Sequence, residues 1–328
     1  KDDILRMSNT ELARFIPEFE TKPKDFIDGP FPEALANILQ QVASETPEKF
    51  TTDFMPLLNT GYHYIYSILL GFWERLNQNK GNLDWKNTLE FIEAYINRED
   101  FWADKFLAKD GRENREATHS WIISAVAELI QIGTQSDEIK SAPQELNDKI
   151  RIITRLCLVK ALGAITTPGE ETDPVSKSLN TAEGKWIKAL LNLSLRLARL
   201  QGKESSQPRW EPEFKAAYED ALMRKVRDAY TIFGMYIANF NYLDKEWTLK
   251  NIGEFIKLPS LYWEALMTGY LHSSHVYDDF YRVMFSHYKK AIAHKFPDTH
   301  AGESLAQHLA IYYLRGLDGL KESELLYD

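Results

Sequence analysis

Histidine is the residue type whose distribution first suggests chemistry in this chain. Six of the eight histidines lie between residues 272 and 308, and histidine nitrogens are common ligands of zinc and iron. His287 and His294 share a helix face but stand seven residues apart, which is roughly 10 Å along a helix axis. The other pairs are further apart or lack neighbouring cysteine and carboxylate ligands. We therefore predict no metal site, and we interpret these residues as partly buried or surface histidines that titrate near about pH 6 to 7.

A pair of aspartates provides a second candidate. The run Asp278-Asp279-Phe280-Tyr281-Arg282 invites comparison with the aspartate-rich motif of terpene synthases, in which carboxylates one helical turn apart hold magnesium against a diphosphate. Here the fifth position is an arginine, and no second magnesium-binding triplet follows. Acidic residues are also common in a first helical turn because they interact favourably with the helix dipole. A prenyl-diphosphate enzyme is therefore not the preferred interpretation.

Other catalytic motifs are either absent from the sequence or too general to identify particular residues. The chain has no GxxxxGK[ST] phosphate loop, no GxGxxG turn and no HExxH zinc motif. A glycosidase would need two carboxylates across an aromatic-lined cleft, and 48 acidic residues leave that pair undefined. The single cysteine, Cys157, falls on an apolar stripe, which predicts a buried thiol rather than a nucleophile. We predict no catalytic residue, no cofactor and no metal ligand in this chain.

The composition disfavours nucleic acid and membrane as partners and predicts a cytoplasmic location. The 328 residues are 44% hydrophobic, which supports a large core, and their net charge of −9 disfavours nucleic acid as a general partner. A single cysteine cannot form an internal disulfide, which favours a reducing compartment and predicts a cytoplasmic location. No apolar run reaches the ~18 residues that a bilayer crossing needs, so we predict no membrane partner. The start, Lys1-Asp2-Asp3, leads us to expect a fragment of a longer polypeptide.

The spacing of the apolar residues predicts an all-α fold. These residues repeat every three or four positions, and almost no segment alternates by two, so they gather on one side of successive helices. The predicted core consists of three such stripes and the inner face of one further helix. The stripes are Tyr62, Ile65, Tyr66, Leu69, Trp73 and Leu76; Leu146, Ile150, Ile153, Cys157 and Ala161; and Tyr277, Phe280, Tyr281, Met284, Tyr288 and Ala291; the further helix has Trp121, Ala125, Leu129 and Ile132 inside.

Helix boundaries follow from capping residues and from proline and glycine. The predicted capping boxes pair Ser8 with Glu11, Ser141 with Gln144 and Asn180 with Glu183, and Asp84 is a predicted N-cap. Gly184 is expected to allow close approach of a neighbouring helix. Helices are predicted at about residues 9–15, 32–44, 61–78, 99–107, 114–132, 141–164, 180–200, 213–227, 228–241, 246–256, 260–272, 276–294 and 301–316. The helix predicted after Asp84 carries Trp85, Leu89 and Ile92.

Two segments rich in proline and glycine divide the chain, near residues 165–180 and 202–212. Neither is long enough to act as a free linker. We predict an N-terminal array of helix pairs over residues 1–165 and a C-terminal array over 180–328, continuous with the first. The preferred architecture is an irregular, HEAT-like α-solenoid of antiparallel helix pairs. The alternative is an α/α toroid, in which the pairs close into a ring.

The helix predicted over residues 181–200 carries the candidate binding surface. It is apolar around most of its circumference, with cationic residues along one narrow stripe, so we expect it to be buried except along that stripe. The stripe is either a solvated edge or a positive ridge that meets an acidic surface of a protein partner. We name these residues the basic strip: Lys185, Lys188, Arg196, Arg199 and Lys203, extended from the preceding helix by Arg151 and Arg155.

One segment resembles a known group of proteins. The run Asp173–Lys185, DPVSKSLNTAEGK, is similar to a DxV…ALNxxxG pattern in the helical regions of large bacterial anti-phage defence proteins, such as STAND-type NTPases and sirtuin-domain proteins. Looser agreement occurs at Asp84-Trp85, at residues 212–215 (PEFK), at 263–265 (WEA) and at 269–271 (GYL). The resemblance implies a helical recognition or scaffold region that contacts a phage protein or other domains of its parent protein. It carries over no catalytic residue.

These observations together predict a non-catalytic helical scaffold. We expect it to bind another protein by shape and charge complementarity, as part of a larger bacterial anti-phage defence protein. The alternative is a toroidal enzyme that acts on a carbohydrate or an isoprenoid. An open array of helix pairs would favour binding, whereas a closed ring with two facing carboxylates in a deep aromatic pocket would favour hydrolysis.

Overall fold

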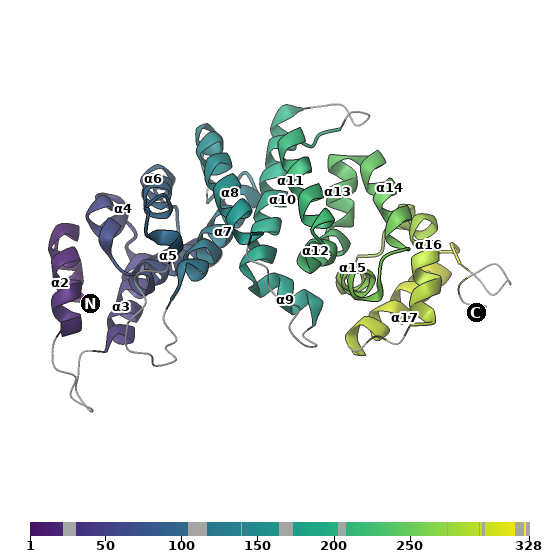
Figure 1. Cartoon of the computed structure of the whole chain (residues 1–328), viewed down its shortest axis with the longest axis horizontal. Helices are drawn as coiled ribbons and strands as arrows, with labels where there is room; N and C mark the ends of the chain where they lie inside the picture. The colour runs from purple at the N-terminus through teal and green to yellow at the C-terminus, as the bar shows by residue number, and fades with distance from the viewer. Residues whose placement is uncertain are drawn as a thin grey trace. The chain divides into compact units, whose positions relative to one another are not determined.

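The computed structural model describes residues 1–21, 31–103, 117–138, 140–163, 173–202, 208–273, 275–294, 296, 299–318 and 325. Every secondary-structure element in these ranges is helical, which confirms the predicted all-α fold (Figure 1). The chain divides into two compact units, Lys1–Ala161 and Leu162–Asp328. Each unit is described by itself below, so a solenoid or a ring built from both stays a prediction.

The helices of unit 1 lie in two layers (Figure 1). In one layer α5 packs between α3 and α7, and in the other α6 lies beside α8. The elements of unit 1 are α1 (Asp2–Arg6), α2 (Asn9–Thr21), α3 (Pro32–Glu45), α4 (Glu48–Thr51), η1 (Met55–Asn59), α5 (Tyr62–Asn77), α6 (Trp85–Ile96), η2 (Phe101–Ala103), α7 (His119–Gln135), η3 (Gln144–Leu146) and α8 (Asn147–Ala161).

Aromatic rings fill the space between these two layers. Phe54 stacks on Phe91 with ring centroids 3.7 Å apart, and the edge of Phe72 meets Phe54 at 5.9 Å. Two buried tyrosines donate their hydroxyls to backbone carbonyls: Tyr62 to the Phe101 oxygen and Tyr95 to the Thr60 oxygen. Because both of these hydroxyls have partners, Tyr62 and Tyr95 contribute ring packing without leaving their own buried oxygens unpaired.

Unit 2 is also built from packed helix rows. Helix α15 contacts α9, α12 and α17, while α10 contacts α9 and α12, and α14 contacts α13 and α16. The elements of unit 2 are α9 (Pro174–Asn180), α10 (Ala182–Gln201), α11 (Pro212–Met223), α12 (Arg227–Met235), α13 (Ile237–Leu243), α14 (Lys245–Phe255), α15 (Ser260–His272), α16 (Asp278–Ile292) and α17 (Thr299–Leu314).

Glycines set the closest helix contacts in both units. A Cβ atom on Gly71 of α5 would lie 2.3 Å from the backbone oxygen of Gln40 in α3. On Gly234 of α12 it would lie 2.1 Å from the Leu266 oxygen in α15, and Gly269 of α15 meets the Thr231 oxygen in α12 at the same distance. These helices therefore pack backbone against backbone, which any larger side chain would prevent.

Two of the predicted helix starts, at Ser8 and at Asp84, are confirmed by side-chain caps. Ser8 Oγ accepts from the Glu11 amide at 3.1 Å, and Glu11 accepts from the Ser8 amide at 2.6 Å, which completes the predicted capping box. Asp84 caps α6 by accepting from the amide of Asn87 at 3.1 Å. Gly184 allows the close approach that we predicted, because a Cβ atom there would lie 1.9 Å from the Ser178 oxygen of α9.

Two predicted capping boxes are wrong. Asn180 is the last residue of α9, and its side chain donates to the Ser176 oxygen, so the N-cap of α10 is Thr181, which accepts from the Gly184 amide at 3.2 Å. Helix α9 itself, capped by Asp173, lies in the proline- and glycine-rich segment near residues 165–180, which we predicted to divide the chain without a helix of its own.

The other capping box fails for a different reason. The hydroxyl of Ser141 donates to the Ser136 oxygen at 2.6 Å instead of capping a helix. Pro143 precedes a short 3₁₀ turn, and α8 begins only at Asn147. The predicted helix start at Asn114 and the second half of the predicted helix over 99–107 lie outside the described residues.

Candidate partner-binding surface

The layer formed by α3, α5 and α7 exposes aromatic side chains that the sequence pattern assigned to the core. Trp121 of α7 has 39% of its surface exposed, so its predicted place on the inner face is wrong. Its ring contacts that of Tyr66 in α5, with centroids 5.2 Å apart and planes at 69°. Tyr66 is partly exposed, whereas the neighbouring stripe residues Ile65 and Leu69 are buried.

Helical spacing extends this exposed area along α5. Leu70 and Trp73 follow Tyr66 by four and seven residues, which places all three on one side of the helix, and all three are partly exposed. We call Tyr66, Leu70, Trp73 and Trp121 the aromatic patch. Large aromatic side chains that keep solvent contact within a structured layer are the residue types that dominate binding energy at protein interfaces.

The tyrosine of the patch keeps its proton. Burial raises the pKa of the Tyr66 hydroxyl, and the nearby carboxylate of Glu128 in α7 raises it further. Tyr66 therefore offers a neutral hydroxyl, which both donates and accepts hydrogen bonds, at the edge of an apolar surface.

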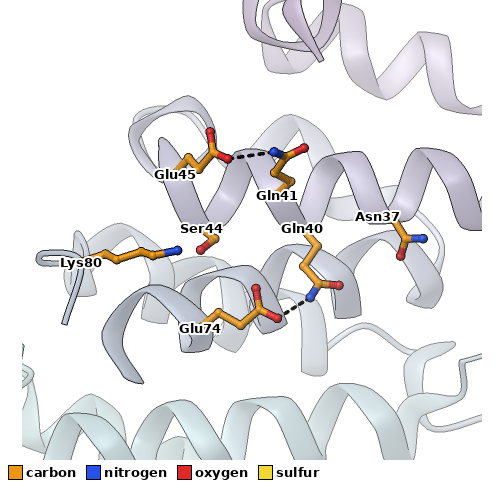
Figure 2. Close-up of a pocket in the computed structure, with 7 residues that line it drawn as sticks. All are labelled: Asn37, Gln40, Gln41, Ser44, Glu45, Glu74 and Lys80. Carbon is orange, nitrogen blue, oxygen red and sulfur yellow. Dashed lines mark hydrogen bonds between the residues drawn. The ribbon is translucent and has the colours of Figure 1, made fainter. Parts of the chain in front are cut away.

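A polar hollow of about 350 Å³ adjoins the same layer, between α3 and α5 (Figure 2). Figure 2 shows Gln40 of α3 facing Glu74 of α5, and Gln41 beside Glu45. The Gln40 amide donates to Glu74 at 2.6 Å, and the Gln41 amide donates to Glu45 at 2.9 Å. The hollow is lined by Asn37, Gln40, Gln41, Ser44, Glu45, Glu74 and Lys80.

The electrostatics of the hollow suit recognition better than acid catalysis. Hydrogen bonds from Lys1 and then Gln41 lower the pKa of Glu45, so this carboxyl group is ionised at neutral pH. A general acid in a glycosidase requires the opposite shift. Glu45 is already paired with Lys1, and Glu74 accepts from the Gln40 amide, so the lining is a polar mixture of carboxylate, amide and ammonium groups.

Only some residues of the basic strip are exposed to solvent. Lys185 and Lys188 are partly exposed and Arg199 is exposed, but Arg196 has only 1% of its surface exposed. The prediction that Arg196 lies on an accessible ridge is therefore wrong. Helix α10 is buried so completely that one residue of its charged stripe also lies inside unit 2. Lys203 lies outside the described residues.

The predicted extension of the strip belongs to unit 1. Arg151 and Arg155 both lie on α8, where Arg155 is exposed and Arg151 pairs with Asp148 across 3.6 Å. Since Lys185, Lys188 and Arg199 belong to unit 2, a single strip that joins the two sets stays a prediction.

Two histidines of the cluster over residues 272–308 are buried and hydrogen-bonded to other residues of the protein. His287 is buried between the indole of Trp263, 3.2 Å from Nδ1, and the Ile252 oxygen, 2.9 Å from Nε2. His308 lies between the Tyr288 hydroxyl at 2.9 Å and the Ser273 oxygen at 3.2 Å. Among the described residues, no group of three or more histidine, cysteine, aspartate or glutamate side chains is arranged to hold a metal ion.

The cysteine and the aspartate pair, which were the other candidates for chemistry, also have roles within the fold. Cys157 is buried, as predicted, and burial raises the pKa of its thiol, which keeps it protonated and unreactive. Asp278, from the aspartate pair, binds the guanidinium of Arg315 at 2.6 Å.

Comparisons with known proteins give no relative for this chain. No protein-family model, no curated protein and no solved structure matches it. Across the described residues, no helix combines the length and the apolar character that crossing a membrane requires.

Sequence reasoning missed the aromatic patch because helical periodicity reports only that residues share a face. Tyr66 and Trp73 occur at core spacing with Tyr62, Leu69 and Leu76, but both are partly exposed, and Tyr66 contacts Trp121 of α7. Two signals in the sequence could have found them. Tyrosine and tryptophan are amphipathic, so they tolerate partial exposure, and the charged residue Glu74 directly follows Trp73.

Proposed function

We propose that this chain is a non-catalytic helical scaffold that binds a protein partner through the face of the α3–α5–α7 layer. The observation that carries the proposal is the contact of exposed Trp121 with partly exposed Tyr66 on adjacent helices. Two aromatic rings held by packed helices lose little conformational entropy on binding, and this is typical of anchor residues.

The neighbouring hollow supports the same proposal. Its carboxylates of Glu45 and Glu74 lie on α3 and α5, and the aromatic patch lies on α5 and α7. An apolar anchor area beside a polar rim is the ordinary composition of a protein interface. The partner that fits is a segment with an apolar side chain for the patch and a polar side chain for the hollow.

The wider biological setting rests on sequence alone. The resemblance of residues 173–185 to helical regions of bacterial anti-phage defence proteins supports a cytoplasmic role as the recognition region of a larger defence protein. The partner would then be a phage protein or another domain of the parent protein. A continuous HEAT-like array of the two units belongs to the same proposal.

Substitution of the patch tests the proposal. We expect the tagged wild-type chain, expressed in its source cells, to co-purify with a partner that Trp121→Ala and Tyr66→Ala variants lose. The matched control is Met223→Ala, because Met223 of α11 is 74% exposed but lies in unit 2. All three variants should keep the wild-type melting temperature within a few degrees. If the same proteins co-purify with the patch variants and the control, the α3–α5–α7 face is not the binding surface.

A further inference from the structure

Helix α8 presents a second exposed face with a different chemical character. Ile152 and Val159 have 53% and 69% of their surfaces exposed, which is high for aliphatic residues, and Leu156 between them is partly exposed. The three residues are four and three positions apart, so they form one line along the helix. On the opposite side, Ile153 and Cys157 are buried in unit 1.

Cationic residues flank this aliphatic line on both sides. At about 100° of rotation per residue, Arg151 and Arg155 lie on one side of the line, and Lys149 and Lys160 lie on the other. Asp148 is the single acidic residue of α8, and it stands at the helix start, where it pairs with Arg151. The helix therefore carries a local positive charge in a chain whose net charge is −9.

Contacts inside unit 1 hold the two lysines at the edge of this face. Lys149 binds Glu93 of α6 at 2.5 Å, and the ammonium group of Lys160 lies 5.5 Å from the centre of the Trp102 ring. Held side chains lose less freedom when a partner arrives than free ones do. The face is thus an apolar line between two basic edges, and one of these edges is fixed in place.

We propose that α8 binds an acidic amphipathic helix of a partner protein, which lies along the helix with its apolar residues on Ile152, Leu156 and Val159. Its carboxylates would meet Arg155 and Arg151 on one side and Lys160 on the other. The complementary pattern is a helix with apolar residues every three or four positions and glutamate or aspartate on both flanks.

The aliphatic line decides between this partner and other anionic molecules. A nucleic acid or an anionic membrane surface would also neutralise these cations. A nucleic-acid backbone is polar and charged, however, and would not bury Ile152 and Val159. Three aliphatic side chains on one short helix also bury too little area to hold a membrane. An amphipathic helix uses both features at once.

A defined peptide probe tests the proposal on the whole chain. The probe is a fluorescent helical peptide of about 18 residues, with leucines spaced three and four apart and glutamates on both flanks. We expect it to bind at low salt and to bind about tenfold more weakly to the Arg155→Glu variant and to the Ile152→Ser/Val159→Ser variant. Met223→Ser removes an equally exposed apolar residue of unit 2 and should leave binding unchanged. Circular dichroism melting checks that each variant is folded.

Several results would overturn the proposal. These are no binding of the glutamate peptide, equal binding of a peptide with lysine flanks, and unchanged affinity in the α8 variants. Tighter binding of single-stranded DNA or of anionic vesicles, abolished by Arg155→Glu but not by the serine variant, would assign the face to that class of molecule instead. A second test places a photo-crosslinking residue at Val159 in cells, and a crosslink to an acidic amphipathic helix supports the proposal, whereas a crosslink to a second copy contradicts it.

Discussion

The hydrogen bonds of His287 fix its protonation state. A backbone carbonyl only accepts hydrogen bonds, so Nε2 carries the hydrogen that reaches the Ile252 oxygen. The indole of Trp263 only donates, so Nδ1 must be the acceptor and must be unprotonated. Burial lowers the pKa of His287 below its usual 6.5, and nearby Lys290 lowers it further, while the bond to Ile252 acts in the other direction. The native state therefore holds this imidazole neutral.

We predict that the stability of the protein falls as pH drops below about 6.5. In the unfolded chain His287 binds a proton near its ordinary pKa of 6.5, whereas in the folded chain it does so only at lower pH. Because the unfolded state then binds more protons, the free energy of unfolding decreases with falling pH, by up to about 1.4 kcal/mol per pH unit for one such histidine. Urea unfolding at pH 7.5, 6.5 and 5.5 measures this slope.

The contribution of His287 can be separated from that of other groups. His308 is also buried and burial lowers its pKa, so it adds to the slope in the same direction. His287→Gln should lower stability at every pH but reduce the slope. His300→Gln is the control for the substitution itself, because it makes the same change at an exposed histidine. An identical slope in wild type and His287→Gln would show that His287 is not the titrating group.

Thr181 is a residue whose role the sequence did not reveal. Its hydroxyl oxygen accepts from the Gly184 amide at the start of α10, and the same hydroxyl lies 3.3 Å from the buried carboxylate of Asp228. Asn180 has an equally good capping side chain and stands one position earlier. The choice between them depends on α9, which ends at Asn180 and leaves Thr181 as the first extended residue.

We predict that Thr181→Ala destabilises the protein more than Asn180→Ala does. The threonine substitution removes the cap of α10 and a hydrogen bond to Asp228, at a cost of about 1–2 kcal/mol. The asparagine substitution removes only an exposed bond to the Ser176 oxygen, and we expect it to cost less than about 0.5 kcal/mol. Urea titrations of the two variants measure the difference. The reverse order would restore Asn180 as the cap.

At the scale of elements, most of the longer helices were predictable, whereas short helices such as α9 and the points at which a helix divides were not. The helices over residues 32–44, 61–78, 246–256 and 260–272 match α3, α5, α14 and α15 within one or two residues, because proline, glycine or aspartate marks their starts. The predicted helix over 228–241 is wrong, since the chain breaks at Tyr236 into α12 and α13. Neither proline nor glycine occupies Tyr236, and the two halves pack against different helices, α15 and α14.

The pairing of α12 with α15 gives a prediction at this scale. We expect Gly234→Ala to destabilise the protein by about 1–3 kcal/mol, because its Cβ atom would lie 2.1 Å from the Leu266 oxygen and force the helices apart. Gly269→Ala should behave alike, with its Cβ atom 2.1 Å from the Thr231 oxygen. Chemical denaturation followed by circular dichroism measures both.

A third glycine provides the matched control. Gly253 lies inside α14 and is exposed, with no atom within 4 Å of the position that a Cβ atom would occupy. Gly253→Ala should therefore stabilise the protein by about 0.5–1 kcal/mol, because alanine loses less backbone entropy on folding than glycine. If all three substitutions had the same sign, the close approach of α12 and α15 would not explain the effect.

At the scale of the whole molecule, the sequence predicted what is buried better than what is exposed. Stripe residues such as Ile150, Ile153, Phe280 and Met284 are buried as expected, because apolar periodicity selects the side of a helix that meets its neighbours. Periodicity carries no information on which neighbour covers the edge of a stripe. The aromatic patch, the burial of Arg196 and the exposed face of α8 all depend on that contact between elements.

The division into units gives the last prediction, because the aromatic patch and the exposed face of α8 both lie within Lys1–Ala161. We expect a chain cut after Gly163, two residues beyond α8, to fold with one cooperative transition, since its aromatic core is made from its own helices. It should bind the glutamate-flanked peptide as tightly as the whole chain, and residues 164–328 should not bind it. Circular dichroism melting and fluorescence anisotropy of the two fragments measure these outcomes. A cooperatively folded first fragment that fails to bind would place the peptide site outside α8, and a fragment without a transition would show that unit 1 does not fold independently.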